Sequence, residues 1–243
     1  MLPISVAGKI DCDFIESYIK GMEDQKSKEY CEFALKRIRE CAIGEKQIIE
    51  KLEEKRWKPF EISKLFDEFV QGKSKGLNHL DECNGIVSYI GATNRNNGIL
   101  SFVKDTKECK YMVQNGNCIG FIRNGQGSVG YAIYKYERFI STSDITFAYS
   151  SWLNKFNGLF VVASQDLIRN KYSFGYKRNN ERLIKDKILL PITSYGNPDY
   201  EYMEKYIKKL MYEKYKEYLA FKNQKHTELR IRPEFGVKNV AEE

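Results

Sequence analysis

Three polar stretches of the chain carry side chains that can contact nucleic-acid bases or phosphates. Two are Asn- and Gly-rich loops, NRNNG at 94–98 and NGQGSVG at 124–130, and the third is the basic stretch 169–187. Asn and Gln can pair bidentately with adenine and Arg with guanine, and Gly lets the backbone come close to a ligand. Each Asn/Gly loop taken alone is also typical of an ordinary hairpin turn.

Side-chain chemistry divides the polar residues into two predicted groups. Compact cations neutralise phosphates without sequence preference, whereas planar amide and guanidinium groups match the donor and acceptor patterns of base edges. The predicted phosphate contacts are Lys73, Lys75, Lys171, Lys177 and Arg178. The predicted base contacts are Asn94, Arg95, Asn96, Asn97, Arg123, Asn124 and Gln126. Asn97 also precedes a glycine, a pair that can simply build a turn.

The sequence offers few residues for metal binding or catalysis. Six cysteines without a C-x-x-C pair and only two histidines predict neither a metal site nor a His-dependent catalytic site. The G-x-G-x-x-G pattern at 125–130 would need a helix after it to bind a dinucleotide, and the residues that follow predict a strand. Asp199, which follows Pro198 as in some nuclease motifs, stands where a helix N-cap is expected. We predict no catalytic residue.

The two ends of the chain repeat each other. Residues 2–33 and 190–221 align without a gap and are identical at 14 of 32 positions. Each copy begins with Leu-Pro-Ile, continues through a glycine to an aspartate, and then shows an apolar period of about 3.6 residues. This pattern predicts an extended segment, a turn and an N-capped amphipathic helix in each copy. Two such helices can bury their apolar stripes by packing antiparallel.

The repeat divides the chain into three predicted parts, namely a helical region at 1–56, a mixed α/β domain at 57–189, and a second helical region with its tail at 190–243. The net charge of +7 lies within the middle part, and a basic field on one module favours an anionic partner. The predicted strands are 85–90, 118–122, 129–133, 139–141 and 159–163. The expected fold class is therefore α+β, with a mixed or antiparallel sheet flanked by two long antiparallel helices that resemble a coiled coil.

The order of these motifs resembles the specificity (S) subunits of type I restriction–modification systems and the related modules of fused type II enzymes. The residues that carry the resemblance are WKPFEISKLF at 57–66, VSYIGATNRNNGI at 87–99, RNGQGSVGYAIY at 123–134, KYSFGYKR at 171–178 and ILLPI at 188–192. In that family two target recognition domains alternate with two helical regions. This chain has one such domain between two helical regions, so it looks like a half subunit.

The resemblance implies a non-catalytic protein that binds double-stranded DNA and directs an adenine-N6 methyltransferase, with a restriction or translocase subunit as a further partner. S-adenosylmethionine would bind the methyltransferase, and the chain itself would need no cofactor. An alternative is a self-associating or inhibitory partner of the methyltransferase, or the specificity segment of a fused type II enzyme. Pairing as a homodimer would predict an interrupted palindromic target, whereas a different half subunit would predict an asymmetric one. No apolar run is long enough to span a membrane and no signal peptide is evident, so a cytoplasmic location is expected.

Overall fold

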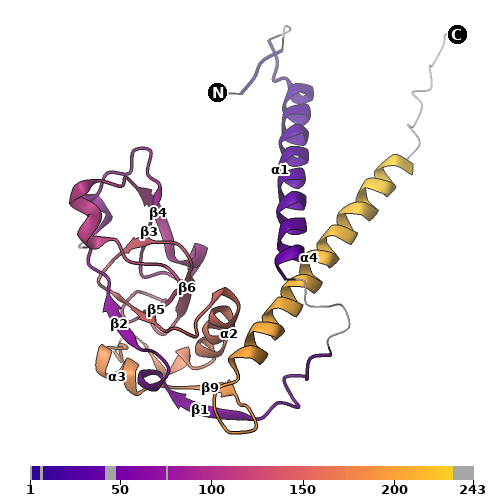
Figure 1. The fold of residues 1–243 in the computed structure, drawn as a ribbon. Coiled ribbons are helices and arrows are strands. Elements are labelled where there is room, and N and C mark those ends of the chain that lie inside the picture. The colour runs from indigo at the N-terminus through magenta and orange to yellow at the C-terminus, as the bar shows by residue number, and fades with distance from the viewer. Residues whose placement is uncertain (1, 6–7, 42–47, 75, 174, 232–243) are drawn as a thin grey trace, which may run out of the picture. The chain divides into compact units, whose positions relative to one another are not determined.

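The computed structural model describes residues 2–5, 8–41, 48–74, 76–173 and 175–231 (Figure 1). The chain forms two compact units. Residues 48–207 make up the globular unit, and residues 1–47 and 208–243 belong to the helical unit. None of the helices among the described residues combines the length and apolar character that crossing a membrane requires.

The described residues of the globular unit form three small sheets (Figure 1). The four-stranded antiparallel sheet has the order β2 (Glu68–Gln71), β8 (Ile145–Tyr149), β5 (Cys118–Ile122) and β6 (Ala132–Lys135). The three-stranded sheet has β3 (Val87–Ile90) in its centre, antiparallel to β4 (Ile99–Val103) and parallel to β7 (Phe139–Ser141). The third sheet is the antiparallel pair of β1 (Trp57–Glu61) and β9 (Lys187–Pro191). With its helices, this arrangement confirms the α+β fold class.

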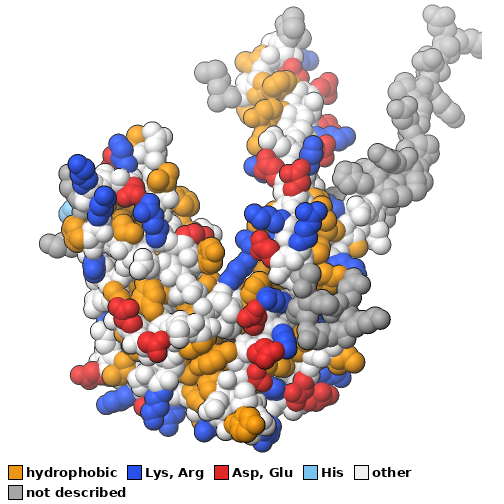
Figure 2. Space-filling view, viewed as in Figure 1, with side chains coloured by type: hydrophobic (Ala, Val, Ile, Leu, Met, Phe, Trp, Pro, Cys, Tyr) orange, Lys and Arg blue, Asp and Glu red, His pale blue; other side chains and the backbone are white. Residues whose placement is uncertain are grey.

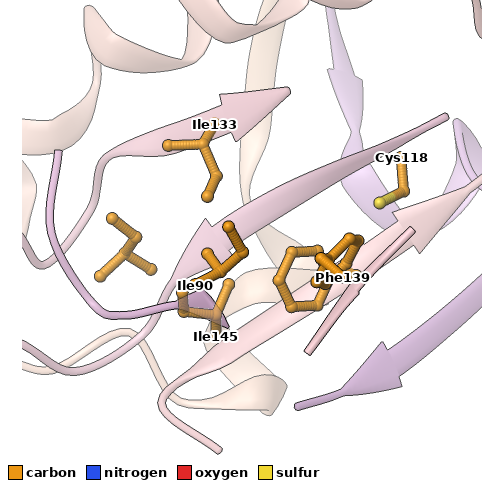
Figure 3. Packing of buried hydrophobic residues seen from close by; sticks show 7 residues of the cluster. Ile90, Cys118, Ile133, Phe139 and Ile145 are labelled. Atoms are coloured by element: carbon orange, nitrogen blue, oxygen red, sulfur yellow. The ribbon is translucent and has the colours of Figure 1, made fainter. Parts of the chain in front are cut away.

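One apolar core joins the two larger sheets (Figure 3). Ile90 from β3 and Phe139 from β7 lie in the same buried cluster as Ile133 from β6 and Ile145 from β8. The rings of Phe139 and Phe147 are 4.4 Å apart between centroids. Burial of each such side chain stabilises the fold by about 1.5–3 kcal/mol. The loops that leave these strands therefore start from a well-packed base.

The strand predicted at 159–163 was wrong, because these residues lie in helix α2 (Lys155–Asp166). Asn154 begins the helix by accepting hydrogen bonds from the backbone N–H groups of Phe156 and Asn157, and the Asn157 side chain bonds back to Asn154 N. A short apolar run fits a buried strand and a buried helix face equally well. The capping asparagines, unlike the apolar run, distinguish a helix from a strand.

The other predicted strands were confirmed in large part. β3, β5 and β7 occupy the predicted segments, whereas the strand predicted at 129–133 begins only at Ala132. The G-x-G-x-x-G loop thus leads into a strand, as predicted. The remaining elements are helix α3 (Asn180–Lys185) and short 3-10 turns at Ile62–Lys64, Leu77–His79, Arg95–Gly98, Lys107–Met112 and Arg169–Lys171.

The helical unit is built from α1 (Cys12–Glu40) and the larger part of α4 (Tyr200–Ile231), whose first residues belong to the globular unit. Tyr30 contacts Tyr218 with ring centroids 4.6 Å apart, and Phe33 contacts Tyr215 at 6.0 Å. The residue numbers of these contacts rise along α1 as they fall along α4. The two helices therefore run antiparallel, which confirms the prediction.

Ala34 lies at a tightly packed position of the helical unit, since its side chain is fully buried. We expect Ala34→Leu to destabilise the helical unit by about 1–3 kcal/mol, because the larger side chain has no space between the helices. Both tryptophans, Trp57 and Trp152, lie in the globular unit. A loss of helical circular dichroism at lower urea, with unchanged tryptophan fluorescence, is the expected result. Equal changes in both signals would contradict it.

Candidate functional site

Five loops of the globular unit meet at one edge of its two larger sheets, and we call them the loop cluster. They are the segments 71–74, 91–98, 123–130, 142–144 and 169–173. Four of them adjoin strands of the packed core, so the register of the sheets sets their positions, and the segment 169–173 lies between α2 and α3. All five segments are described in the structure. Lys75, a predicted phosphate contact that directly follows the first segment, lies outside the described residues.

Backbone contacts hold the loops of the cluster together. Thr142 N donates to Ile90 O over 3.0 Å, and Ser74 forms an isolated parallel bridge with Thr142. The Gln71 side chain donates to Ser143 O over 2.8 Å. The loop 71–74 and the turn 142–144 therefore lie side by side at the end of β3.

Two glycines allow the loop 123–130 to approach its neighbours. A Cβ added at Gly125 would lie 2.8 Å from Ala92 O, so this glycine lets the loop pass directly against the loop 91–98. Gly130 has a φ of +90°, and an added Cβ there would lie 2.9 Å from Arg169 O. Any other residue at Gly130 would be strained in this left-handed region and too close to the neighbouring backbone. The two loops predicted to read bases are thus brought together.

Four of the predicted base contacts present free polar groups. Asn94, Arg95, Asn96 and Gln126 are exposed, and within the described part of the chain their side chains have no hydrogen-bond partner. Asn96 has a φ of +48°, a conformation that asparagine tolerates better than most residues. The role of these residues toward DNA stays a prediction. Their placement gives planar donors and acceptors on two adjacent loops.

The other three predicted base contacts already bind the protein itself. The Asn97 amide donates to Tyr134 O over 2.8 Å, and the Asn124 amide donates to Asp144 Oδ1 over 3.0 Å. The Arg123 guanidinium donates to Ser143 O. Burial lowers the pKa of Arg123 from its ordinary value, and the nearby Asp144 carboxylate opposes that shift. These three side chains hold the loops in place, whatever they do toward a ligand.

The predicted phosphate contacts differ from one another in exposure. Lys73 lies in the loop cluster and Lys177 lies six residues after Lys171, and both are exposed without an ion pair to any described residue. Lys171 is about half exposed and is paired with Asp186. An ammonium that already has a carboxylate partner offers less attraction to a phosphate than a free one.

The prediction that Arg178 faces a phosphate was wrong, because this side chain is fully buried. Its guanidinium lies 3.0 Å from Asp186 Oδ2 and packs between the rings of Phe121 and Tyr172, 4.9 and 5.3 Å from their centroids. It also donates to Gly130 O at 3.4 Å. Burial lowers the pKa of Arg178 and the Asp186 carboxylate raises it. Arg178 supports the loop 123–130 from below and has no exposed surface for a ligand.

Sequence reasoning missed several residues of the cluster. Tyr131, Arg169 and Asn170, which were not predicted, line a pocket of about 350 Å³ together with the predicted Gln126. The Arg169 guanidinium stacks on the Tyr131 ring, 4.7 Å from its centroid. Arg169 and Asn170 open the basic stretch 169–187, which was a signal that could have marked them. Gln71 and Ser143 carried no such signal, because only the pairing of β8 with both β2 and β5 brings them beside Arg123.

Comparison with known proteins adds a sequence relationship to this geometry. No protein-family model matches the chain. The chain is 31% identical over 158 residues to the specificity subunit S.BcgI of a type II restriction enzyme from Heyndrickxia coagulans. This similarity confirms the resemblance carried by the motifs.

The match spans 63% of this chain and 43% of S.BcgI, so this chain covers less than half of the length of that protein. Among solved structures, a type I restriction–modification S subunit from M. genitalium aligns with 81% of this chain and 52% of its own, with 15% identity and a TM-score of 0.48. The HsdS subunit from Thermoanaerobacter tengcongensis aligns with 86% of this chain and 48% of its own, with 10% identity and a TM-score of 0.43.

Proposed function

We propose that this chain is a sequence-specific DNA-binding module that directs an adenine-N6 methyltransferase to its target. The observation that carries the proposal is the loop cluster, in which Asn94, Arg95, Asn96 and Gln126 expose planar polar groups on adjacent loops of a packed sheet. Planar amides and guanidinium groups are the side chains that read base edges in the major groove. The relationship to a restriction-enzyme specificity subunit supports the same role.

In this proposal the chain binds and the partner catalyses. The methyltransferase holds S-adenosylmethionine and transfers the methyl group, and this chain positions the complex on double-stranded DNA. A restriction or translocase subunit joins the same complex. Equilibrium dialysis with labelled S-adenosylmethionine checks the division of roles, with binding expected for the methyltransferase and for the complex but not for this chain alone.

The direct test is to sequence the methylated DNA of cells that carry this chain as the specificity component of its methyltransferase. We expect a defined methylated motif that disappears when the chain is deleted. Methylation that is unchanged or increased on deletion would instead support an inhibitory partner of the methyltransferase. A symmetric split motif would indicate two identical recognition units on the DNA, and an asymmetric one would indicate two different units.

Lys73 should contribute to affinity without contributing to sequence preference. We expect Lys73→Ala to weaken binding to all duplexes similarly and to lower the slope of log affinity against log salt by about one unit, because one phosphate contact is lost. Lys64→Ala is a matched control, since Lys64 is an exposed cation paired with Glu61 outside the loop cluster. A salt slope that stays unchanged in Lys73→Ala would remove Lys73 from the interface.

A further inference from the structure

One arginine of the loop cluster is held flat against an aromatic ring. The Arg169 guanidinium lies over the Tyr131 ring, 4.7 Å from its centroid. Stacking of this kind fixes the plane in which the N–H groups of a guanidinium lie. Its Nη1 group also donates a hydrogen bond of 3.4 Å to Asp166 O. The protein therefore sets the orientation of this side chain before any ligand binds.

The backbone around Arg169 explains why the stack forms. Gly130, with its φ of +90°, brings the loop 123–130 so close to the segment 169–173 that an added Cβ would lie 2.9 Å from Arg169 O. Tyr131 follows this glycine, and its carbonyl accepts a hydrogen bond of 2.9 Å from Ile122 N at the end of β5. The sheet thus fixes the ring, and the close approach at Gly130 places Arg169 beside it.

The other side of the guanidinium is open. Arg169 is partly buried, and within the described part of the chain its Nε and Nη2 groups have no hydrogen-bond partner and are not enclosed by protein. These two groups lie on the same side of a guanidinium and donate parallel hydrogen bonds. Arg169 lines the pocket of about 350 Å³ together with the exposed residues Gln126 and Asn170. A fixed pair of donors is therefore available beside a loop that is predicted to read bases.

Attraction to DNA and selection of a base need different side chains. Figure 2 shows Lys and Arg side chains gathered over the end of the globular unit that carries β3 and β4, and exposed cations of this kind attract phosphates without selecting a base. Arg95 is exposed and has no partner among the described residues, so a ligand must immobilise it. Arg123 and Arg178 are bonded within the protein. Of these four arginines, Arg169 combines a fixed plane with an open edge.

We propose that Arg169 is a specificity-determining residue that reads one guanine of the target, and that Tyr131 is the positioning residue that holds it. Guanine is the base whose major-groove edge carries two acceptors, N7 and O6, and a guanidinium pairs with both at once. The proposal rests on the proposed function, because it assigns one base to one side chain of the DNA-binding module. Arg169 is not among the base contacts predicted from the sequence, so the assignment comes from the stack and the open edge.

The role of Arg169 is tested with the full chain in complex with its methyltransferase, on a duplex that carries the methylated motif. Each guanine of the motif, on either strand, is replaced in turn by 7-deazaguanine, which lacks the N7 acceptor. We expect the wild-type complex to lose affinity by roughly 5-fold or more at one guanine in particular. In Arg169→Ala the same replacement should change affinity by less than roughly 2-fold, while the effects at other guanines remain. Each effect is a ratio between two duplexes on one protein, so a smaller folded fraction does not alter it.

Arg182→Ala is the matched control. The Arg182 guanidinium also lies over a tyrosine ring, 3.9 Å from the Tyr176 centroid, but it belongs to α3 and lies outside the loop cluster. Its loss should leave every guanine effect as in the wild type. Guanine effects that Arg169→Ala leaves intact, or that no guanine shows in the wild type, would overturn the proposal while sequence preference persists. A complex that does not prefer the motif over a scrambled duplex would contradict the proposed function as well.

Two further variants separate base reading and positioning from simpler roles. Arg169→Lys keeps the charge but not the stacked plane, so it should lack most of the guanine effect; wild-type affinity without that effect would indicate a phosphate contact and overturn the proposal. Tyr131→Phe keeps the ring and should bind as the wild type does, whereas Tyr131→Leu should reduce the effect at the same guanine by at least roughly half. In an Arg169→Ala background, Tyr131→Leu should weaken the preference for the motif no further, because a positioning residue acts through the arginine that it holds. An equal loss in both backgrounds would contradict the positioning role.

Discussion

Replacing Arg178 by alanine is expected to destabilise the globular unit by about 3–5 kcal/mol. The guanidinium is fully buried and paired with Asp186, so its removal leaves a buried carboxylate with only the half-exposed Lys171 as a cation partner among the described residues. The rings of Phe121 and Tyr172 and the carbonyl of Gly130 lose their contact at the same time. Urea unfolding followed by tryptophan fluorescence measures the effect in the globular unit alone, because both tryptophans lie there.

Lys177→Ala is the matched control for the loss of a positive charge. Lys177 is the adjacent residue and is exposed, so its removal should change the free energy of unfolding by less than about 0.5 kcal/mol. Arg178→Lys should give an intermediate loss, because an ammonium keeps the charge but cannot stack between two rings. An Arg178→Ala protein of unchanged stability that binds every duplex more weakly would restore the phosphate role that the structure contradicts.

Gln126→Ala is expected to change which DNA sequence is bound, with a loss of about 1–3 kcal/mol in discrimination at one base pair. The Gln126 amide is exposed on the loop 123–130, beside the pocket that Arg169 and Asn170 also line. If the amide pairs bidentately with one base, its loss removes the preference at that base pair and leaves the rest of the site unchanged. Competition between duplexes that differ at single base pairs measures the change.

Gln126→Glu provides the control of equal size. The carboxylate can accept hydrogen bonds but cannot donate them, so it should shift the preferred base rather than only relax the preference. Lys73→Ala should weaken all duplexes alike in the same assay. If Gln126→Ala also gave a uniform loss, the division between base and phosphate contacts would be incorrect.

The helical parts of the fold were predictable because their signals are local. The N-caps Asp11 and Asp199 and the turn glycines Gly8 and Gly196 each act within a few residues, and the structure has them as predicted. The segment 159–163 was misread because a short apolar run does not distinguish a strand from a helix. The pairing of β1 with β9 joins residues far apart in the sequence, and no pattern within either strand specifies its partner.

The candidate site could be predicted only as a set of residue types. The Asn/Gly loops were recognisable, but their meeting depends on the register of the sheets and on the close approach of Gly125 to Ala92. The burial of Arg178 was not predictable from a basic stretch, because it depends on Asp186 lying beneath the same loop. Charge in a sequence indicates which side chains can bind an anion, and the fold decides which of them remain exposed.

The pairing of β1 with β9 has a consequence for how such proteins can change. Trp57 faces Pro191 across this ladder, so the first and last strands of the globular unit lie side by side. A unit whose ends lie side by side can be exchanged for another of the same kind with little disturbance to the segments outside it. The helices and the globular unit can therefore diverge at different rates, and a new unit spliced in at these two points would inherit the existing framework.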